Sequence, residues 1–117
     1  MKKETKEYRP WGYYKVLYDG EHIKIKQLVV YPEQRLSYQR HSFRSEHWFI
    51  LDGECKFTLN GNSFNSVKGQ SMTINACEWH RVLNTSKKEN LIILEIQTGC
   101  SFEESDIERM DDDYGRF

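Results

Sequence analysis

Hydrophobic and polar residues alternate along most of the chain, in short segments that turn residues separate. Segment 22–31, HIKIKQLVVY, shows the pattern most clearly. One face of this segment carries Ile23, Ile25 and Val29, and the other carries Lys24, Lys26, Leu28 and Val30. Alternation with a period of two predicts a β-strand. The same reasoning predicts strands in the segments GYYKVLYD, EHWFIL, CKFTLN, SMTINA, EWHRVLN and LIILEIQTG, which recur roughly every ten residues.

Turn-forming residues mark the ends of several of these strands. Asp19-Gly20 is a two-residue turn signal, and Asp52-Gly53 and Asn60-Gly61 both favour type I′ hairpin turns. Pro32 has no backbone N–H, so we expect it to end the hydrogen bonding of segment 22–31. The chain should therefore fold back on itself at these positions.

The C-terminal tail departs from the strand pattern. Its sequence, EESDIERMDDDYGRF, is expected to be helical or irregular, with Ser105 as a candidate N-cap. Many short strands with almost no helix predict an all-β sandwich or jelly-roll barrel. An immunoglobulin-like sandwich fits less well, because the cysteines do not suggest its buried disulfide. We expect one domain over residues 1–117, with a core at about 9–99 and a tail at 100–117.

Composition narrows the range of partners and locations. The chain has 17 Lys and Arg and 18 Asp and Glu, a formal net charge of −1, which removes the electrostatic argument for binding nucleic acid or an anionic membrane. No apolar run approaches the ~20 residues of a membrane span, and the N-terminus lacks the apolar region of a secretory signal. Cys55, Cys77 and Cys100 are widely spaced and are expected to be reduced thiols in a cytoplasmic protein.

Two histidine-containing stretches carry the candidate chemistry. In the first, Gln39 and His41 share one face of a strand, and Glu46 begins the next strand after a short turn. His80 lies in the second stretch, GQSMTINACEWHRVLN. Imidazole, carboxylate and amide oxygen together suit a divalent Zn, Mn, Fe, Co or Ni ion, with one or two coordination positions left for water or substrate. We predict a metal site formed by Gln39, His41, Glu46 and His80. His47 alternates to the other face and is expected to form a structural hydrogen bond.

The two stretches resemble the paired cupin motifs H-x-H-x4-E-x6-G and G-x5-P-x-G-x2-H-x3-N. Gln39 takes the first His position, and Asn75 and Cys77 take the Pro and Gly positions of the second motif. The remaining positions that match are His41, Glu46, Gly53, Gly69, His80 and Asn84. The resemblance implies an RmlC-like cupin jelly roll.

Longer motifs resemble one family, the cupin domain of type II mannose-6-phosphate isomerases. This domain often forms the C-terminal part of bifunctional mannose-1-phosphate guanylyltransferase/mannose-6-phosphate isomerase enzymes. The family's R-P-W-G-x-Y is present as RPWGYY, and its L-S-L-Q-x-H-x-H-R-x-E-H-W as LSYQRHSFRSEHW. Its ending, E-D-D-I-x-R-x-x-D-x-Y-G-R, is matched by ESDIERMDDDYGR. The chain departs from the family at Phe43, where the family usually has His, at Asn75, which replaces a turn Pro, and at Glu33, which replaces a Gly.

The resemblance implies a metal-dependent aldose–ketose isomerase that interconverts mannose 6-phosphate and fructose 6-phosphate through an enediol(ate). A small-molecule sugar phosphate is then the expected partner, and dimerisation through sheet edges is common among cupins, so a homodimer is expected. As a stand-alone form of the domain, the chain is not expected to transfer nucleotides. Two alternatives stay open: a cupin isomerase or epimerase acting on another (nucleotide-)sugar, because Phe43 is expected to alter the pocket, and a non-catalytic sugar- or metabolite-binding cupin.

Six further residues receive candidate roles in this isomerase. Arg44 adjoins the ligand strand and could stabilise charge, and Glu95 is a candidate general base. Lys26 is a third catalytic candidate, because an ammonium on the apolar Leu28 face is unusual without a partner. The candidates for substrate binding are Gln97, which shares a face with Glu95, and Arg109 and Arg116, which match the family's tail and suit a phosphate. Each cation also has a plain alternative in pairing with nearby carboxylates or reaching water.

Overall fold

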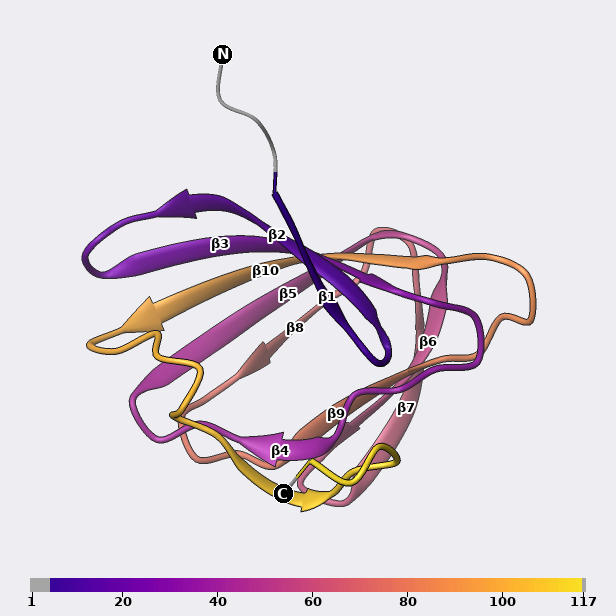
Figure 1. The fold of residues 1–117 in the computed structure, drawn as a ribbon. Coiled ribbons are helices and arrows are strands. Elements are labelled where there is room, and N and C mark those ends of the chain that lie inside the picture. Colours follow the sequence, from indigo (N-terminus) through magenta and orange to yellow (C-terminus); the bar gives the residue numbers. More distant parts are fainter. Residues whose placement is uncertain (1–4, 117) are drawn as a thin grey trace.

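The computed structural model describes residues 5–116, which form two facing antiparallel sheets (Figure 1). The six-stranded sheet has the order β1-β2-β3-β10-β5-β8, with β1 (Lys6–Arg9), β2 (Gly12–Asp19), β3 (Ile23–Val30), β10 (Leu91–Gly99), β5 (Arg44–Asp52) and β8 (Ser71–Ile74). The five-stranded sheet has the order β11-β4-β9-β6-β7, with β11 (Glu108–Asp111), β4 (Tyr38–Arg40), β9 (His80–Asn84), β6 (Glu54–Leu59) and β7 (Asn62–Val67). The prediction of an all-β chain is confirmed. Within residues 5–116 no helix is long and apolar enough to cross a membrane.

The turn predictions are confirmed at one site and revised at two. Asn60 and Gly61 have φ angles of 47° and 84° and join β6 to β7 as a two-residue hairpin. The hairpin between β2 and β3 is longer than the Asp19-Gly20 signal indicated, because β3 starts only at Ile23. The hairpin predicted at Asp52-Gly53 is wrong, since β5 and β6 belong to different sheets. The dipeptide marks a sharp change of direction, but it does not determine whether the next strand pairs with the previous one.

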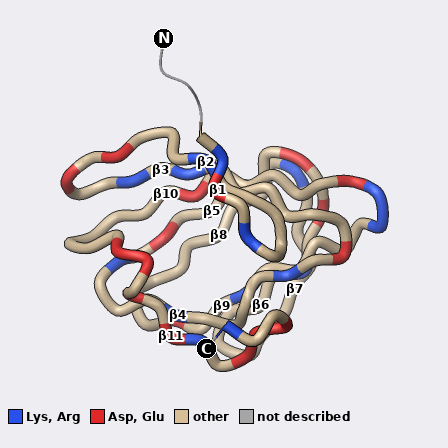
Figure 2. The backbone as a smooth tube through the Cα atoms, in the orientation of Figure 1, with Lys and Arg blue, Asp and Glu red and all other residues tan. Residues whose placement is uncertain are grey.

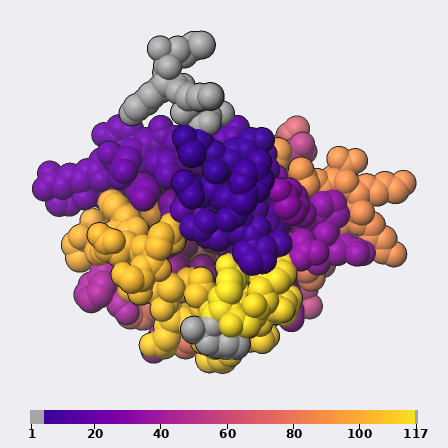
Figure 3. All heavy atoms as spheres, in the orientation of Figure 1, coloured from indigo at the N-terminus to yellow at the C-terminus, as the bar shows by residue number. Residues whose placement is uncertain are grey.

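Apart from one short strand the described tail is irregular, so the irregular alternative is confirmed for most of it, and the helix capped by Ser105 is wrong. Residues 100–107 are irregular, and β11 then pairs antiparallel with the edge of β4. An exposed strand edge offers unpaired N–H and C=O groups, and a strand satisfies these groups where a helix would not. In the space-filling view the C-terminal tail (yellow) lies against the N-terminal strands (indigo) (Figure 3).

The apolar core lies between the two sheets and is formed by their inward-facing side chains. Trp48 and Ile50 on β5 meet Phe57 on β6 and Val82 on β9, all fully buried. The face of β3 that carries Lys26, Leu28 and Val30 is buried and is the inner face. The three cysteines are free thiols, which confirms the expectation for them. Charges of both signs are distributed along the backbone (Figure 2).

A second group of buried residues in the same interior is polar. It consists of Lys26, His41, Arg44, Glu46, His80, Glu95 and Gln97. Burying charges is costly unless they are paired or coordinate an ion. The jelly roll thus encloses an apolar core and, beside it, a polar centre that requires a chemical explanation.

Candidate metal centre

Three side chains from both sheets converge at the centre of the polar group. His41 directly follows β4, Glu46 lies on β5, and His80 is the first residue of β9. One ligand atom of each lies within 4.8 Å of the others, and all three residues are buried. The Glu46 carboxylate lies between the two rings, with Oε1 3.5 Å from His80 Nε2 and Oε2 3.7 Å from His41 Nε2.

Main-chain carbonyls fix the orientation of both imidazoles. His41 Nδ1 lies 2.7 Å from the Asp106 oxygen, and His80 Nδ1 lies 2.9 Å from the Glu78 oxygen. A carbonyl oxygen only accepts, so each Nδ1 carries a proton, and in the neutral ring each Nε2 presents a lone pair to the centre. Among residues 5–116, the buried His80 Nε2 has no hydrogen-bond partner. A metal ion would give this nitrogen the partner that the protein does not provide.

The charge states of the cluster also suit a cation. Burial alone would raise the pKa of Glu46, but His80, His41 and Arg44 together hold the pKa below its usual value. Burial lowers the pKa of His41, and the Arg44 charge adds to that effect. A carboxylate anion beside a neutral imidazole is the form in which these groups bind metals. The three residues therefore fit a divalent ion.

Gln39 lies beside this cluster, as the sequence predicted. It is directly opposite His80 in the β4–β9 pairing, and its Nε2 lies 3.4 Å from His41 Nε2. Its oxygen accepts a hydrogen bond of 2.6 Å from the Ser37 hydroxyl, which turns the oxygen away from the cluster. Rotation of the amide would exchange the two atoms. Ligation by Gln39 stays a prediction.

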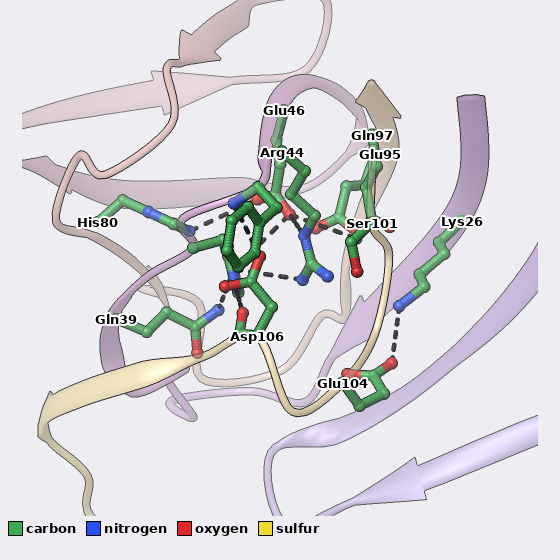
Figure 4. Close-up of polar contacts among 12 residues, drawn as sticks. Lys26, Gln39, Arg44, Glu46, His80, Glu95, Gln97, Ser101, Glu104 and Asp106 are labelled. Atoms are coloured by element: carbon green, nitrogen blue, oxygen red, sulfur yellow. Dashed lines mark hydrogen bonds and ion pairs between the residues drawn. The ribbon is translucent and has the colours of Figure 1, made fainter. Parts of the chain in front are cut away.

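A chain of hydrogen bonds extends from the cluster along β5 and β10 (Figure 4). Glu46 accepts hydrogen bonds from Arg44 Nε at 3.2 Å and from Gln97 Nε2 at 3.3 Å. Gln97 Nε2 also donates to Glu95 Oε1 at 2.7 Å. Burial, and then the charge of Glu46, raises the pKa of Glu95 to about 8. The centre thus holds an ionised carboxylate and a second carboxyl group that binds its proton near neutral pH.

The candidate cations occupy different places around the cavity. Arg44 is buried in the cluster, and Lys26 lies further out, where its ammonium pairs with Glu104 at 2.9 Å. Arg116 donates to Asp112 through its guanidinium and its main-chain N–H. Arg109 donates to the Arg116 oxygen at 3.0 Å, and its Nε is buried without a partner in the described part of the chain. The cavity is lined by Arg9, Trp11, Tyr14, Lys26, Leu28, Leu36, Gln39, His41, Arg44, Glu46, Glu95, Gln97, Glu104, Arg109 and Arg116.

Three residues in contact with the site were not singled out from the sequence: Tyr14, Glu104 and Asp106. Each lies within a motif that carried the resemblance, RPWGYY or ESDI, so position within those motifs was the available signal.

The structure also bears on the expectations for His47 and Phe43. His47 bonds to the Thr73 hydroxyl at 3.0 Å, as expected of a structural histidine. Phe43 is 57% exposed, so the departure at this position places a ring on the outer surface of the loop.

Comparison with known sequences agrees with these observations. Residues 1–112 match the family described as mannose-6-phosphate isomerase C-terminal. The alginate biosynthesis protein AlgA of Pseudomonas aeruginosa is 39% identical over 109 residues, which are 93% of this chain and 22% of that protein. The mannose-1-phosphate guanylyltransferase ManC of Salmonella typhimurium is 36% identical, again over 93% of this chain and 22% of that protein. The chain therefore spans less than a quarter of these relatives.

Solved structures confirm the fold. An RmlC-like cupin from Shewanella frigidimarina superposes with a TM-score of 0.76 and covers 87% of this chain and 88% of its own. At 13% identity this likeness concerns the fold alone. The predicted RmlC-like cupin jelly roll is thus confirmed.

Proposed function

The chain belongs to the mannose-6-phosphate isomerase C-terminal family, and from that premise we propose that it is a metal-dependent isomerase of mannose 6-phosphate and fructose 6-phosphate. The observation that carries the proposal is the buried cluster of His41, Glu46 and His80, which faces a cavity also lined by Glu95. The matched family model supports the choice of reaction, and the cluster supports its dependence on a metal.

The metal would be held by His41, Glu46 and His80, with Gln39 as a fourth candidate ligand. Zn, Mn, Co, Fe and Ni all accept such a mixed set of donors. When bound, the ion supplies Lewis-acid stabilisation of the negative charge that develops on the sugar oxygens. The two main-chain carbonyls behind the imidazoles keep both Nε2 atoms aimed at the same point.

Glu95 is the proposed proton carrier of the isomerisation. The reaction removes the proton on C2, returns a proton to C1, and moves the hydroxyl proton from O2 to O1, so one group must both accept and donate. Such a group works best with a pKa near the operating pH, and the Glu95 pKa of about 8 meets that condition. Gln97 donates to the Glu95 carboxylate and holds it in place.

Arg44 is proposed to stabilise charge at the centre. Its Nε donates to Glu46, and one of its terminal nitrogens lies 3.4 Å from His41 Nε2. The other terminal nitrogen donates to the Glu103 oxygen at 3.3 Å. These contacts fix a permanent positive charge beside the proposed metal ligands, where it would stabilise an oxyanion of the substrate.

Gln97 and two arginines are proposed to bind the substrate. Arg109 is the better placed of the two arginines, because its Nε is buried without a partner in the described residues. Arg116 is held by Asp112, and both arginines line the cavity. Arg109 Nε would therefore be available to donate a hydrogen bond to an anionic group of the substrate.

The test is turnover of mannose 6-phosphate by chelator-treated protein reloaded separately with Zn, Mn, Co, Fe or Ni. Formation of fructose 6-phosphate is followed with coupled enzymes. We expect turnover with at least one metal and its loss in His80→Ala. His47→Ala is the matched control, because this exposed histidine contacts the Thr73 hydroxyl at the surface, away from the cluster, and the variant should retain activity.

Other outcomes would redirect the assignment. A folded protein that binds metal but turns over a different sugar would be an isomerase or epimerase of another sugar or nucleotide-sugar. One that binds sugar phosphate without turnover under any metal would be a binding module. Equal activity of wild type and His80→Ala would show that the cluster takes no part in the reaction.

We also propose that the protein forms a homodimer through sheet edges. In the structure the outer strands are β1 and β8 of one sheet and β7 and β11 of the other. Such edges present unpaired backbone groups to a second strand. Sedimentation equilibrium at several protein concentrations tests this, and a monomer at all of them would refute it.

A further inference from the structure

We propose that Lys26 and Tyr14 form an anion-binding site that the carboxylate of Glu104 fills in the free protein, and that the phosphate of the substrate displaces Glu104 from it. The site is assigned from the contacts of these three residues. The identity of the displacing anion as a sugar phosphate rests on the proposed function. This role replaces the catalytic role that the sequence suggested for Lys26.

Lys26 is the buried cation at the base of this site. Its side chain is 4% exposed, and it projects from the same face of β3 as the core residues Leu28 and Val30. Its ammonium lies 2.9 Å from Glu104 Oε1 (Figure 4). A buried ammonium without an anion is strongly unfavourable. The position therefore favours an anion beside Lys26, and in the free protein Glu104 supplies it.

Tyr14 supplies a second donor to the same oxygen. Its hydroxyl lies 3.0 Å from Glu104 Oε1, and Arg9 donates to that hydroxyl at 3.3 Å. The Tyr14 ring lies near both cations, with its centroid 4.3 Å from the Lys26 ammonium and 5.1 Å from the Arg9 guanidinium. Glu104 Oε1 thus accepts hydrogen bonds from Lys26 and Tyr14, and Arg9 in turn donates to the Tyr14 hydroxyl.

The pKa values of the contact agree with an ionised carboxylate. Burial works to raise the pKa of Glu104, but the charge of Lys26 and the hydrogen bonds from Lys26 and Tyr14 outweigh it and lower the pKa. Burial, and then the charge of Glu104, raises the pKa of Tyr14 to about 12, so its hydroxyl keeps the proton that it donates.

Glu104 is attached in a way that allows its carboxylate to leave. Its side chain is 55% exposed, although its partner Lys26 is buried. The irregular segment that carries it is fastened on both sides to the loop of Phe43, through the Cys100 N–H on one side and the Asp106 carboxylate on the other. Rotation of the flexible Glu104 side chain into solvent leaves both fastenings in place.

The cavity is small for a sugar phosphate while Glu104 occupies the site. The cavity that contains the site has a volume of about 70 Å³, whereas ligand pockets typically measure about 300–1,000 Å³. A phosphate dianion carries more charge and more acceptor oxygens than a carboxylate. It can therefore engage Lys26, Tyr14 and the neighbouring Arg9 and Arg109 together, where Glu104 offers one oxygen to two donors.

The Glu104 carboxylate competes with phosphate for the site and so reduces the apparent affinity for phosphate. Phosphate binds only the fraction of molecules in which Glu104 has left the site, and the apparent dissociation constant rises accordingly. Removing the Glu104 charge should then strengthen phosphate binding. An ordinary structural ion pair predicts no such gain.

The experiment is a titration of chelator-treated protein with inorganic phosphate, followed by amide NMR shifts at low ionic strength. We expect Glu104→Gln to bind phosphate about tenfold or more tightly than wild type. Lys26→Met should weaken binding about tenfold or more, because the main cation is lost. Tyr14→Phe keeps the ring, removes one donor, and serves as the second variant if Lys26→Met does not fold.

Glu103→Gln is the matched control, since it removes the same charge from the neighbouring exposed residue. It measures the general effect of one fewer negative charge near the cavity. Equal gains in Glu104→Gln and Glu103→Gln would overturn the proposal. Unchanged phosphate binding in Tyr14→Phe or in folded Lys26→Met would also overturn it.

The titration is independent of turnover. Phosphate binding that follows the expected order in a protein without isomerase activity would sustain the anion site and refute the proposed function. Turnover combined with no gain in Glu104→Gln would do the reverse. In an active protein, Glu104→Gln should lower the KM for mannose 6-phosphate.

Discussion

The Nδ1 atom of His41 lies 2.7 Å from the main-chain oxygen of Asp106, a residue 65 positions later in the chain. The carboxylate of the same aspartate accepts the main-chain N–H groups of Ser42 and Phe43 at 2.9 and 3.0 Å. One tail residue therefore orients a candidate ligand and also fixes the loop that follows it. The C-terminal tail therefore helps to build the candidate metal centre, as the strands do.

Asp106→Ala should weaken metal binding without removing a ligand. Loss of the carboxylate frees the Ser42–Phe43 backbone, so the Asp106 carbonyl and the His41 ring are no longer held in register. Loss of a residue that supports a ligand typically costs about 10–100-fold in metal affinity. Competition with a chromophoric chelator measures the affinity directly.

Asp113→Ala is the control for this change. Asp113 pairs with Arg35 at 2.6 Å, so the control also removes a tail carboxylate, together with its ion pair to Arg35. We expect metal affinity close to wild type. Similar losses in the two variants would mean that the tail acts only through overall stability.

Glu46→Gln should destabilise the metal-free protein strongly. Glu46 accepts hydrogen bonds from Arg44, Trp48 and Gln97 in a fully buried site. Neutralising it leaves the buried Arg44 charge without its anion, and breaking a buried pair in this way costs about 3–5 kcal/mol. Urea unfolding monitored by tryptophan fluorescence gives the free energy of unfolding.

The adjacent His47 supplies the comparison. It lies on the same strand, but it faces outward and is exposed. His47→Ala should cost less than about 1 kcal/mol. A cost for Glu46→Gln as small as this would show that Arg44 finds another partner and that the network contributes little to stability.

The alternation of residues predicted most of the strands, though not β1, β7 or β11, and it placed Lys26 on the same face of β3 as Leu28 and Val30. It also placed Glu95 and Gln97 together, because side chains two residues apart in a strand share a face. The same alternation placed Gln39 and His41 on one face, whereas Glu46, on β5 of the other sheet, was included because of the motif spacing. These inferences depend on local geometry, which the sequence encodes directly.

The relations that the sequence did not reveal depend on contacts between distant segments. Asp52-Gly53 signals a turn, but β6 pairs with β7 and β9, which come later in the chain, and not with β5. Ser105 resembled a helix cap, yet the free edge of β4 made a strand at Glu108–Asp111 the better solution. The pairing of Lys26 with Glu104 joins residues 78 positions apart, so no local pattern points to it.

Stability in the metal-free state should depend on pH through Glu95. The folded protein has a Glu95 pKa of about 8, whereas a glutamate in an unfolded chain titrates near about 4.3. Between these values the folded state keeps a proton that the unfolded state has released, so stability falls as pH rises. The contribution is complete below the lower value and lost as pH passes through the higher one.

Glu95→Gln should remove this dependence. The free energy of unfolding of the variant, minus that of wild type, should rise between pH 4.5 and 8 with a slope of up to about 1.4 kcal/mol per pH unit. Urea titrations at each pH provide both values. Glu54→Gln, at an exposed position of β6, should give a flat difference. A flat difference for Glu95→Gln as well would show that Glu95 is ionised in the folded protein.

Gly12→Ala should disrupt the strand that carries Tyr14. Gly12 has a φ of 155°, and a Cβ placed there would lie 1.9 Å from the main-chain oxygen of Val29. Val29 belongs to β3, the strand of Lys26, so relief of the clash must separate the two strands that form the anion site. Backbone strain and overpacking together should cost about 2–5 kcal/mol. Thermal or urea unfolding measures the loss.

Gly69→Ala separates the clash from the effect of φ. Gly69 also has a positive φ, 91°, but among the described residues no heavy atom lies within 4 Å of the position that an alanine Cβ would take. An alanine there should cost only the strain of a left-handed backbone, about 1–2 kcal/mol. If the two variants are equally destabilised, the contact with Val29 relaxes at no cost. If Gly12→Ala is much the worse, close contact between β2 and β3 is what holds Tyr14 beside Lys26.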